Sequence, residues 1–189
     1  MKTKPIIFLD NDGVICLANN WGSRYKKTKA YANPNPDNEQ SIPVEFRFDN
    51  FDEKAIKVLN EIITETDCEI VVSSDWRHFA TLEELGEYYL SQGIIKKPIG
   101  YTTSSVKIPE GFNWVRQWDL EQERALEIKE YLMEHPEITH WVAVDDLDMG
   151  ITEEWKESWG LTNFVYTPLS REGIKQSGVK EKIIKYLVD

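Results

Sequence analysis

The sequence predicts an α/β fold in which a parallel β-sheet carries helices on both faces. Short apolar runs alternate along the chain with segments whose apolar residues recur at helical spacing, the order expected of βαβ units. Several runs contain no polar residue, which is typical of strands buried on both faces of a sheet. The length of 189 residues fits a single domain, residues 1–189, with a small insertion.

The composition is that of an ordinary globular protein with an acidic surface. Hydrophobic residues make up 41% of the chain, and the formal net charge is −11. An acidic surface repels polyanions, so binding to nucleic acid is possible but not favoured, and binding to a membrane is not expected. A small anionic substrate remains compatible with this charge if a cation bridges it to the protein.

The two cysteines, Cys16 and Cys68, have no zinc-binding spacing and adjoin predicted buried strands. Buried free thiols are therefore expected, and cysteines without disulfides are typical of proteins in the reducing cytoplasm. The apolar run near the N-terminus is too short for a signal peptide, and no segment reaches transmembrane length. We therefore expect a cytoplasmic protein, whereas the oligomeric state cannot be deduced from these patterns.

The first predicted strand, residues 5–9, ends in two aspartates separated by one residue. Asp10 and Asp12 follow the apolar run, and Gly13 allows the backbone to turn sharply after them. Ligands of open α/β sheets bind just beyond the carboxyl ends of the strands. The stretch therefore suggests a metal-assisted carboxylate site, and the alternative is a strand that simply ends in an Asp-Gly turn.

Residues 17–50 are expected to form a cap or lid inserted after the first strand. Such a long irregular stretch inside a compact domain is usually functional, although a disordered surface loop is the alternative. Within it, residues 33–38 carry a strong turn signal, and the alternation in residues 43–48 suggests a short strand. A basic cluster in the same stretch either attracts a phosphorylated substrate or forms a solvated face: Arg24, Lys26, Lys27 and Lys29.

The middle of the chain alternates helices with strands. Asp52 can cap a helix, and a buried strand at residues 68–72 then ends in Ser73 and Ser74. Thr81 can cap the next helix, which reaches about residue 91. A third strand is expected within residues 98–102, followed by a loop to about residue 120.

The last part of the chain repeats this alternation. A helix is expected over residues 121–134, and a buried strand at residues 140–144 then ends in Asp145 and Asp146. The remaining elements are expected to be a strand over residues 164–167 and a helix over residues 179–187.

Three strands thus end in oxygen-bearing side chains, and the ends of parallel strands share one edge of the sheet. If the strands are neighbours, the four carboxylates of Asp10, Asp12, Asp145 and Asp146 converge there. Such crowding would protonate some of them unless a cation were present. Oxygen ligands with positions left open favour Mg²⁺, and such an ion suits a phosphoryl substrate.

These polar strand ends, in their order along the chain, resemble the motifs of the haloacid dehalogenase-like (HAD) superfamily. Residues 10–14 (Asp-Asn-Asp-Gly-Val) resemble motif I, residues 71–73 motif II, and residues 142–146 the acidic motif IV. Arg124 fits the cation of motif III best, although Lys107, Arg116 or a merely solvated Arg124 are alternatives. Three segments look similar to a bacterial and phage branch related to the HAD domains of RNA-repair proteins: residues 73–77, 124–128 and 144–149.

The resemblance implies a Rossmann-like HAD fold and a role for each matching residue. Asp10 would be the nucleophile and Asp12 the general acid and base. Asp10, the Asp12 backbone carbonyl and the Asp145–Asp146 pair would bind Mg²⁺, with Asp146 favoured for direct coordination. Arg124 and a hydroxyl, Ser73 in preference to Ser74, would bind the phosphoryl group.

The sequence therefore predicts a Mg²⁺-dependent phosphatase that acts on a small phosphorylated metabolite or nucleotide through an aspartyl-phosphate. One alternative is a phosphatase of polynucleotide ends in nucleic-acid repair. The other is a non-catalytic HAD scaffold for protein interaction, which the full set of acidic and hydroxyl residues disfavours.

Overall fold

The computed structural model describes residues 3–18, 43–103 and 117–189, without the side chains of residues 117–119. Most of the expected cap, including its basic cluster and its turn signal, lies outside the described residues. Two of the alternative motif III cations, Lys107 and Arg116, also lie outside them. The division of the chain into a core and a cap therefore stays a prediction.

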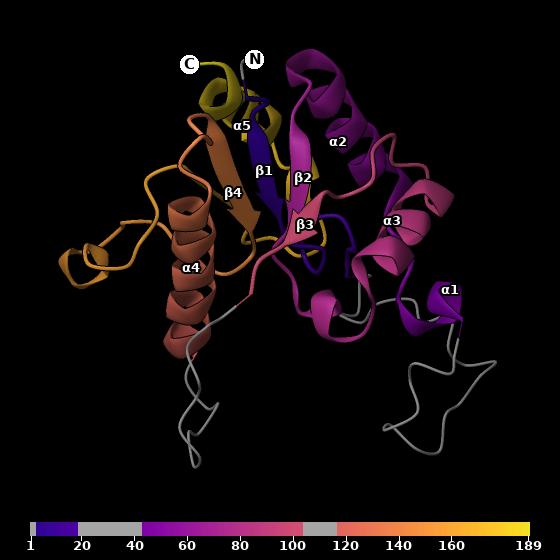
Figure 1. The fold of residues 1–189 in the computed structure, drawn as a ribbon, viewed down its shortest axis with the longest axis horizontal. Coiled ribbons are helices and arrows are strands. Elements are labelled where there is room, and N and C mark those ends of the chain that lie inside the picture. Colours follow the sequence, from indigo (N-terminus) through magenta and orange to yellow (C-terminus); the bar gives the residue numbers. More distant parts are fainter. Residues whose placement is uncertain (1–2, 19–42, 104–116) are drawn as a thin grey trace, which may run out of the picture.

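A five-stranded parallel sheet forms the centre of the molecule, with the strand order β3-β2-β1-β4-β5. The first strand lies in the middle, between β2 and β4, and Figure 1 shows these three strands ending at the same edge. The predicted α/β fold is confirmed. The strands are β1 (Ile6–Leu9), β2 (Glu69–Val72), β3 (Gly100–Tyr101), β4 (Trp141–Asp145) and β5 (Phe164–Tyr166).

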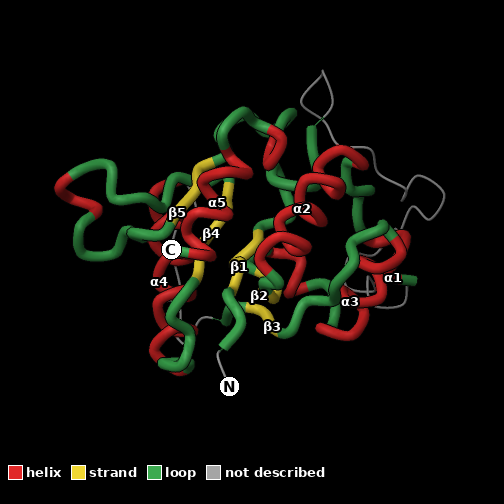
Figure 2. The backbone as a smooth tube through the Cα atoms, turned by 90° about the horizontal axis from the view of Figure 1, so that it is seen from above, coloured by secondary structure: helices red, strands yellow, loops and turns green. Residues whose placement is uncertain are grey.

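Helices cover both faces of the sheet, so the described molecule has three layers (Figures 1 and 2). The side chains of β1 alternate between two cores: Ile7 and Leu9 belong to the core of α2, α3 and α5, and Ile6 and Phe8 to that of α4. The helices are α1 (Val44–Arg47), α2 (Glu53–Thr66), α3 (Leu82–Ser91), α4 (Gln117–Glu134) and α5 (Val179–Val188). Three 3₁₀ turns complete the described elements: η3 (Asp75–His78), η4 (Glu154–Lys156) and η5 (Gly173–Lys175).

The predicted helix starts agree with the structure where a side chain caps the helix. Asp52 accepts a hydrogen bond from the Ala55 backbone N–H at 2.9 Å. Thr81 and Glu84 form a reciprocal capping box at the start of α3. The two cysteines are buried and do not form a disulfide with each other, as expected. No described helix combines the length and the apolar character that a membrane span requires.

The prediction of a short strand over residues 43–48 was wrong, because the structure has the helix α1 there. The alternating pattern also places Val44 and Phe48 four residues apart, the spacing of one helical face. Both side chains pack against the core that contains α2 and α3. Arg47 pairs with Glu84 of α3 through two hydrogen bonds of 2.9 and 3.0 Å, which holds α1 against α3.

Candidate active site

The register of the sheet brings the polar strand ends together. Leu9 of β1 is paired with Val72 of β2 and with Val144 of β4. The backbone ladder continues one step further, because Ser73 donates to the Leu9 carbonyl at 2.9 Å and Asp10 to the Val144 carbonyl at 3.1 Å. Asp10, Ser73 and Asp145 therefore follow these three strands side by side.

A tight loop after β1 brings the motif I residues against motif IV. The Asn11 carbonyl accepts hydrogen bonds from the Ile15 and Cys16 N–H groups, at 3.0 and 2.7 Å. At Gly13 the φ angle is +72°, and a Cβ atom there would lie 2.0 Å from Asp146 Oδ2. Only glycine fits this position, because the Asp146 carboxylate occupies the space of a side chain.

Arg124 of α4 reaches the carboxylates at the strand ends. Its Nη1 lies 3.3 Å from Asp10 Oδ1 and 3.1 Å from Asp145 Oδ2, and its Nη2 lies 3.1 Å from Asp75 Oδ1. The side chain is only 11% exposed, so it is not the solvated arginine considered as an alternative. Burial alone would lower the pKa of Arg124, but Asp145, Asp10 and Asp75 together raise it above its ordinary value.

Asp10, Asp145 and Asp146 form an acidic cluster in which one oxygen of each lies within 4.8 Å of the others. Burial, and then the charge of Asp145, raise the pKa of Asp10 well above its ordinary value, and Arg124 opposes this rise. The pKa of Asp145 is raised by burial and is likewise opposed by Arg124. One arginine against three carboxylates leaves net negative charge, and oxygen donors in this arrangement fit a hard divalent cation.

Several buried polar atoms at this edge have no hydrogen-bond partner among the described residues. They include the hydroxyls of Ser73 and Ser74, the Thr167 hydroxyl and the Asn11 amide nitrogen. Ser73 and Ser74 are at most 1% exposed, and unpaired polar groups are costly to bury. These donors suit a ligand with several acceptor oxygens, but burial does not distinguish Ser73 from Ser74.

Asp12 lies partly exposed beside the buried cluster and contacts an indole. Trp76 of η3 donates its Nε1 hydrogen to Asp12 Oδ2 at a distance of 3.1 Å. The Trp76 side chain is 5% exposed. This tryptophan is therefore part of the core and at the same time contacts Asp12.

A second, largely buried ion pair connects η3 with α4, and it was not predicted from the sequence. Arg77 donates to Glu127 Oε1 at 2.7 Å, and Thr102 donates to Glu127 Oε2 at 3.2 Å. Burial raises the pKa of Glu127, and Arg77 opposes the rise. The position of Glu127 near the site could have been predicted, because it lies three residues after Arg124 and therefore on the same side of the helix. The Arg77 side chain is only 9% exposed, so most of this ion pair is shielded from water.

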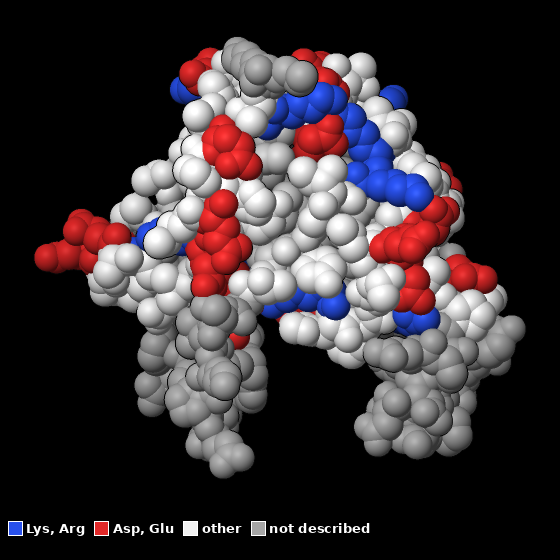
Figure 3. All heavy atoms as spheres, in the orientation of Figure 1, with Lys and Arg blue, Asp and Glu red and all other residues white. Residues whose placement is uncertain are grey.

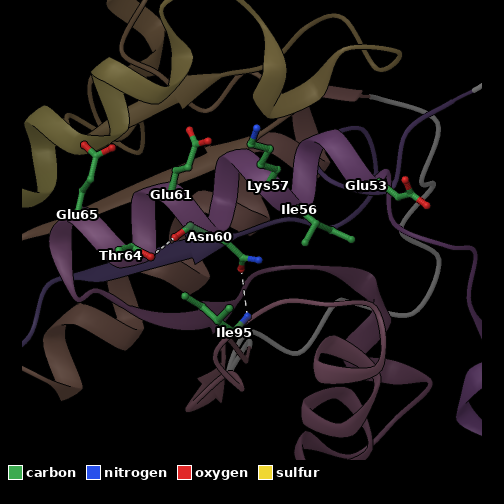
Figure 4. Close-up of a pocket in the computed structure, with 8 residues that line it drawn as sticks. All are labelled: Glu53, Ile56, Lys57, Asn60, Glu61, Thr64, Glu65 and Ile95. Carbon is green, nitrogen blue, oxygen red and sulfur yellow. Dashed lines mark hydrogen bonds between the residues drawn. The ribbon is translucent and has the colours of Figure 1, made fainter.

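A hollow elsewhere on the surface lies outside the candidate active site. It runs along α2 and has a volume of about 510 Å³. Figure 4 shows the Ile95 backbone N–H donating to Asn60 Oδ1 at the hollow, and charged side chains of α2 are among the residues that line it: Glu53, Lys57, Glu61 and Glu65. None of the predicted site residues lines this hollow.

One family model matches the chain. It describes the HAD domain in Swiss Army Knife RNA repair proteins and covers residues 6–179, from the first residue of β1 to the first residue of α5. No curated protein and no solved structure matches the chain. The matched domain suggests a phosphatase-type hydrolase, and the strand order and the acidic strand ends agree with it. Because the match covers most of its length, the chain belongs to the family of HAD domains found in Swiss Army Knife RNA repair proteins.

Proposed function

We propose that the protein is a Mg²⁺-dependent phosphomonoester hydrolase that forms an aspartyl-phosphate on Asp10. The observation that carries the proposal is the contact of Arg124 with both Asp10 and Asp145 at the carboxyl ends of β1 and β4. The Asp10 carboxylate, the Arg124 guanidinium and the Ser73 hydroxyl, which has no hydrogen-bond partner among the described residues, lie at one edge of the sheet. Such a set can bind a phosphoryl group and attack it.

In the first step, an oxygen of Asp10 bonds to phosphorus, and the bond from phosphorus to the leaving oxygen breaks. Asp12 gives its proton to the leaving oxygen, so the product departs as an alcohol. In the second step, Asp12 takes a proton from water, whose oxygen bonds to phosphorus as the bond to Asp10 breaks. Arg124 offsets the phosphoryl charge, and a serine hydroxyl, Ser73 or Ser74, donates to a phosphoryl oxygen.

We propose that Asp10, the Asp12 backbone carbonyl and Asp146 would hold the cation, and the grouping of the Asp10 and Asp146 carboxylates supports this choice. Asp145 is already held by Arg124 and by the Leu147 N–H, which donates to its Oδ1 at 2.8 Å. We therefore favour Asp146 over Asp145 as the direct ligand. Bound Mg²⁺ would neutralise carboxylate charge and make the site attractive to an anion.

A phosphatase of polynucleotide ends is the second candidate, and the RNA-repair description of the family favours it. The net charge of −11 weighs against it, because contacts to a nucleic-acid backbone need Lys and Arg. Figure 3 shows basic side chains bordered by acidic ones on one face of the molecule. Among the described residues, Lys96 pairs with Asp67 and Lys97 with Glu87, which reduces the charge they offer to phosphates.

The test is a panel of phosphomonoesters and of oligonucleotides with 5′- or 3′-phosphates, assayed for phosphate release with Mg²⁺ and with EDTA. The wild type is expected to release phosphate only with Mg²⁺, and Asp10→Asn is expected to release none. Asp189→Asn, an exposed aspartate at the end of α5, is the matched control. Release from oligonucleotide ends alone would favour the second candidate. No release from any substrate would contradict the proposal and favour a non-catalytic scaffold.

A further inference from the structure

We propose that Trp76 is a positioning residue that fixes the orientation of the Asp12 carboxyl group for proton transfer to the leaving group. The inference rests on the proposed function, in which Asp12 is the general acid. It adds a residue outside the set of carboxylates, hydroxyls and arginine described above.

The contact itself defines the geometry. Trp76 Nε1 lies 3.1 Å from Asp12 Oδ2, within the range of a hydrogen bond between an N–H group and a carboxylate. An indole nitrogen is only a donor, so this bond requires Oδ2 to act as an acceptor. Because one oxygen of the carboxyl group is held by the indole, rotation of the Asp12 side chain is restricted and the group keeps one orientation.

The indole ring is held in place by aromatic neighbours. Phe48 stacks on Trp76 with ring centroids 4.2 Å apart and planes 4° apart, and Phe51 stacks at 5.3 Å and 18°. Tyr88 of α3 packs against the same ring at 5.9 Å. The side chain therefore has little freedom to turn, and its N–H keeps one direction.

The backbone of η3 links this ring to the phosphate-binding strand end. The Ser74 carbonyl accepts hydrogen bonds of 3.2 Å from the Arg77 N–H and from its guanidinium. The two residues before Trp76 in this turn are Ser74 and Asp75, and Asp75 contacts Arg124. One short turn thus holds the general acid in a fixed relation to the groups that bind the phosphoryl oxygens.

The test uses the dependence of the reaction on the leaving group. An alkyl phosphate needs a proton on its leaving oxygen, whereas 4-nitrophenyl phosphate releases a stable anion without one. Trp76→Phe keeps a stacked ring and removes the N–H. Its kcat/KM is expected to fall at least about tenfold more for the alkyl phosphate than for 4-nitrophenyl phosphate, because general acid catalysis contributes about 10²–10⁴-fold.

Trp155→Phe is the matched control. Trp155 also donates its indole hydrogen to a carboxylate, Glu153 Oε2 at 2.6 Å, but it is half exposed and belongs to η4. This variant loses the same kind of bond and is expected to keep the wild-type ratio between the two substrates.

A second variant serves if Trp76→Phe does not fold. Phe48→Leu keeps the indole N–H but removes the ring stacked on it, so the ratio is expected to shift in the same direction by a smaller factor. Equal losses on both substrates, or no loss, in variants of an active wild type would overturn the inference alone. A wild type inactive on both substrates would instead overturn the proposed function, and the inference with it.

Discussion

At the scale of single residues, Gly13 is the position least able to accept a side chain. An added Cβ would lie 2.0 Å from the Asp146 carboxylate, and the φ of +72° is unfavourable for a residue with a Cβ. Gly13→Ala is expected to displace Asp146 and to cost more than about 1 kcal/mol of stability. Activity assays should show a lower kcat and a higher Mg²⁺ concentration for half-maximal rate.

Gly178 provides the control for this prediction, because its φ is +80° and nothing lies within 4 Å of an added Cβ. Gly178→Ala carries similar backbone strain without a collision. It is expected to lose stability but to keep the wild-type Mg²⁺ dependence. A Gly13→Ala protein with an unchanged Mg²⁺ requirement would contradict the proposed contact with the metal site.

The buried carboxyl of Asp10 gives the metal-free protein an unusual dependence on pH. Its folded-state pKa lies well above 3.8, owing to burial and to Asp145, Asp12 and Asp146, while Arg124 opposes the rise. A carboxyl with a raised pKa keeps its proton longer in the folded state than in the unfolded state. Stability without Mg²⁺ is therefore lost as the pH rises from about 4 through the folded-state pKa.

Asp10→Asn removes this titrating charge and the repulsion it causes. In EDTA at pH 8 the variant is expected to melt at a higher temperature than the wild type, by about 2–4 °C for each kcal/mol recovered. The difference should shrink as the pH falls toward 4. Thermal denaturation of both proteins across this range checks it, and a difference in melting temperature that stays constant between pH 4 and pH 8 would rule it out.

At the scale of elements, the turn η3 and the helix α4 are joined by two ion pairs. Asp75 pairs with Arg124, and Arg77 pairs with Glu127 one turn further along the helix. Glu127→Ala would leave the buried Arg77 charge without this partner and is expected to cost about 3–5 kcal/mol. The double variant Arg77→Met/Glu127→Leu should recover much of this loss in urea denaturation.

The exposed pair of Lys97 and Glu87 is the comparison, with side chains 48% and 60% exposed. Glu87→Ala is expected to cost far less than Glu127→Ala, because surface pairs contribute little. Similar losses for the two variants would mean that burial does not determine the effect.

The elements differ in how far the sequence could predict them. The strands β1 and β4 are apolar without interruption because both faces of the sheet are covered, so both were predicted together with Asp10 and Asp145 at their ends. The helix α1 was missed because one short pattern fits both a strand and a helix. The contacts of Arg77 and Trp76 depend on how distant segments pack, which no local pattern records.

At the scale of the whole molecule, a bound cation should stabilise the fold. The acidic cluster consists of Asp10, directly after β1, and of Asp145 and Asp146 at the end of β4. An ion bound there would therefore bridge the ends of two strands. A Mg²⁺ concentration one hundred times Kd is expected to add about 2.7 kcal/mol. Differential scanning fluorimetry should show the melting temperature rising with Mg²⁺ in the wild type and little change in Asp146→Asn. NaCl of equal ionic strength controls for screening, and equal shifts in both salts would contradict a specific site.

The central position of β1 also has a consequence for synthesis on the ribosome. Ile6 pairs with Glu69 on one side and with Trp141 on the other, so β1, which precedes the other described strands, waits longest for its second neighbour. Such distant pairings raise the contact order and slow folding. The last contact of the motif I loop comes still later, because Ile174 donates to the Val14 carbonyl at 2.9 Å. A nascent chain therefore contains Asp10 early but cannot complete the surroundings of the motif I loop until η5 has emerged.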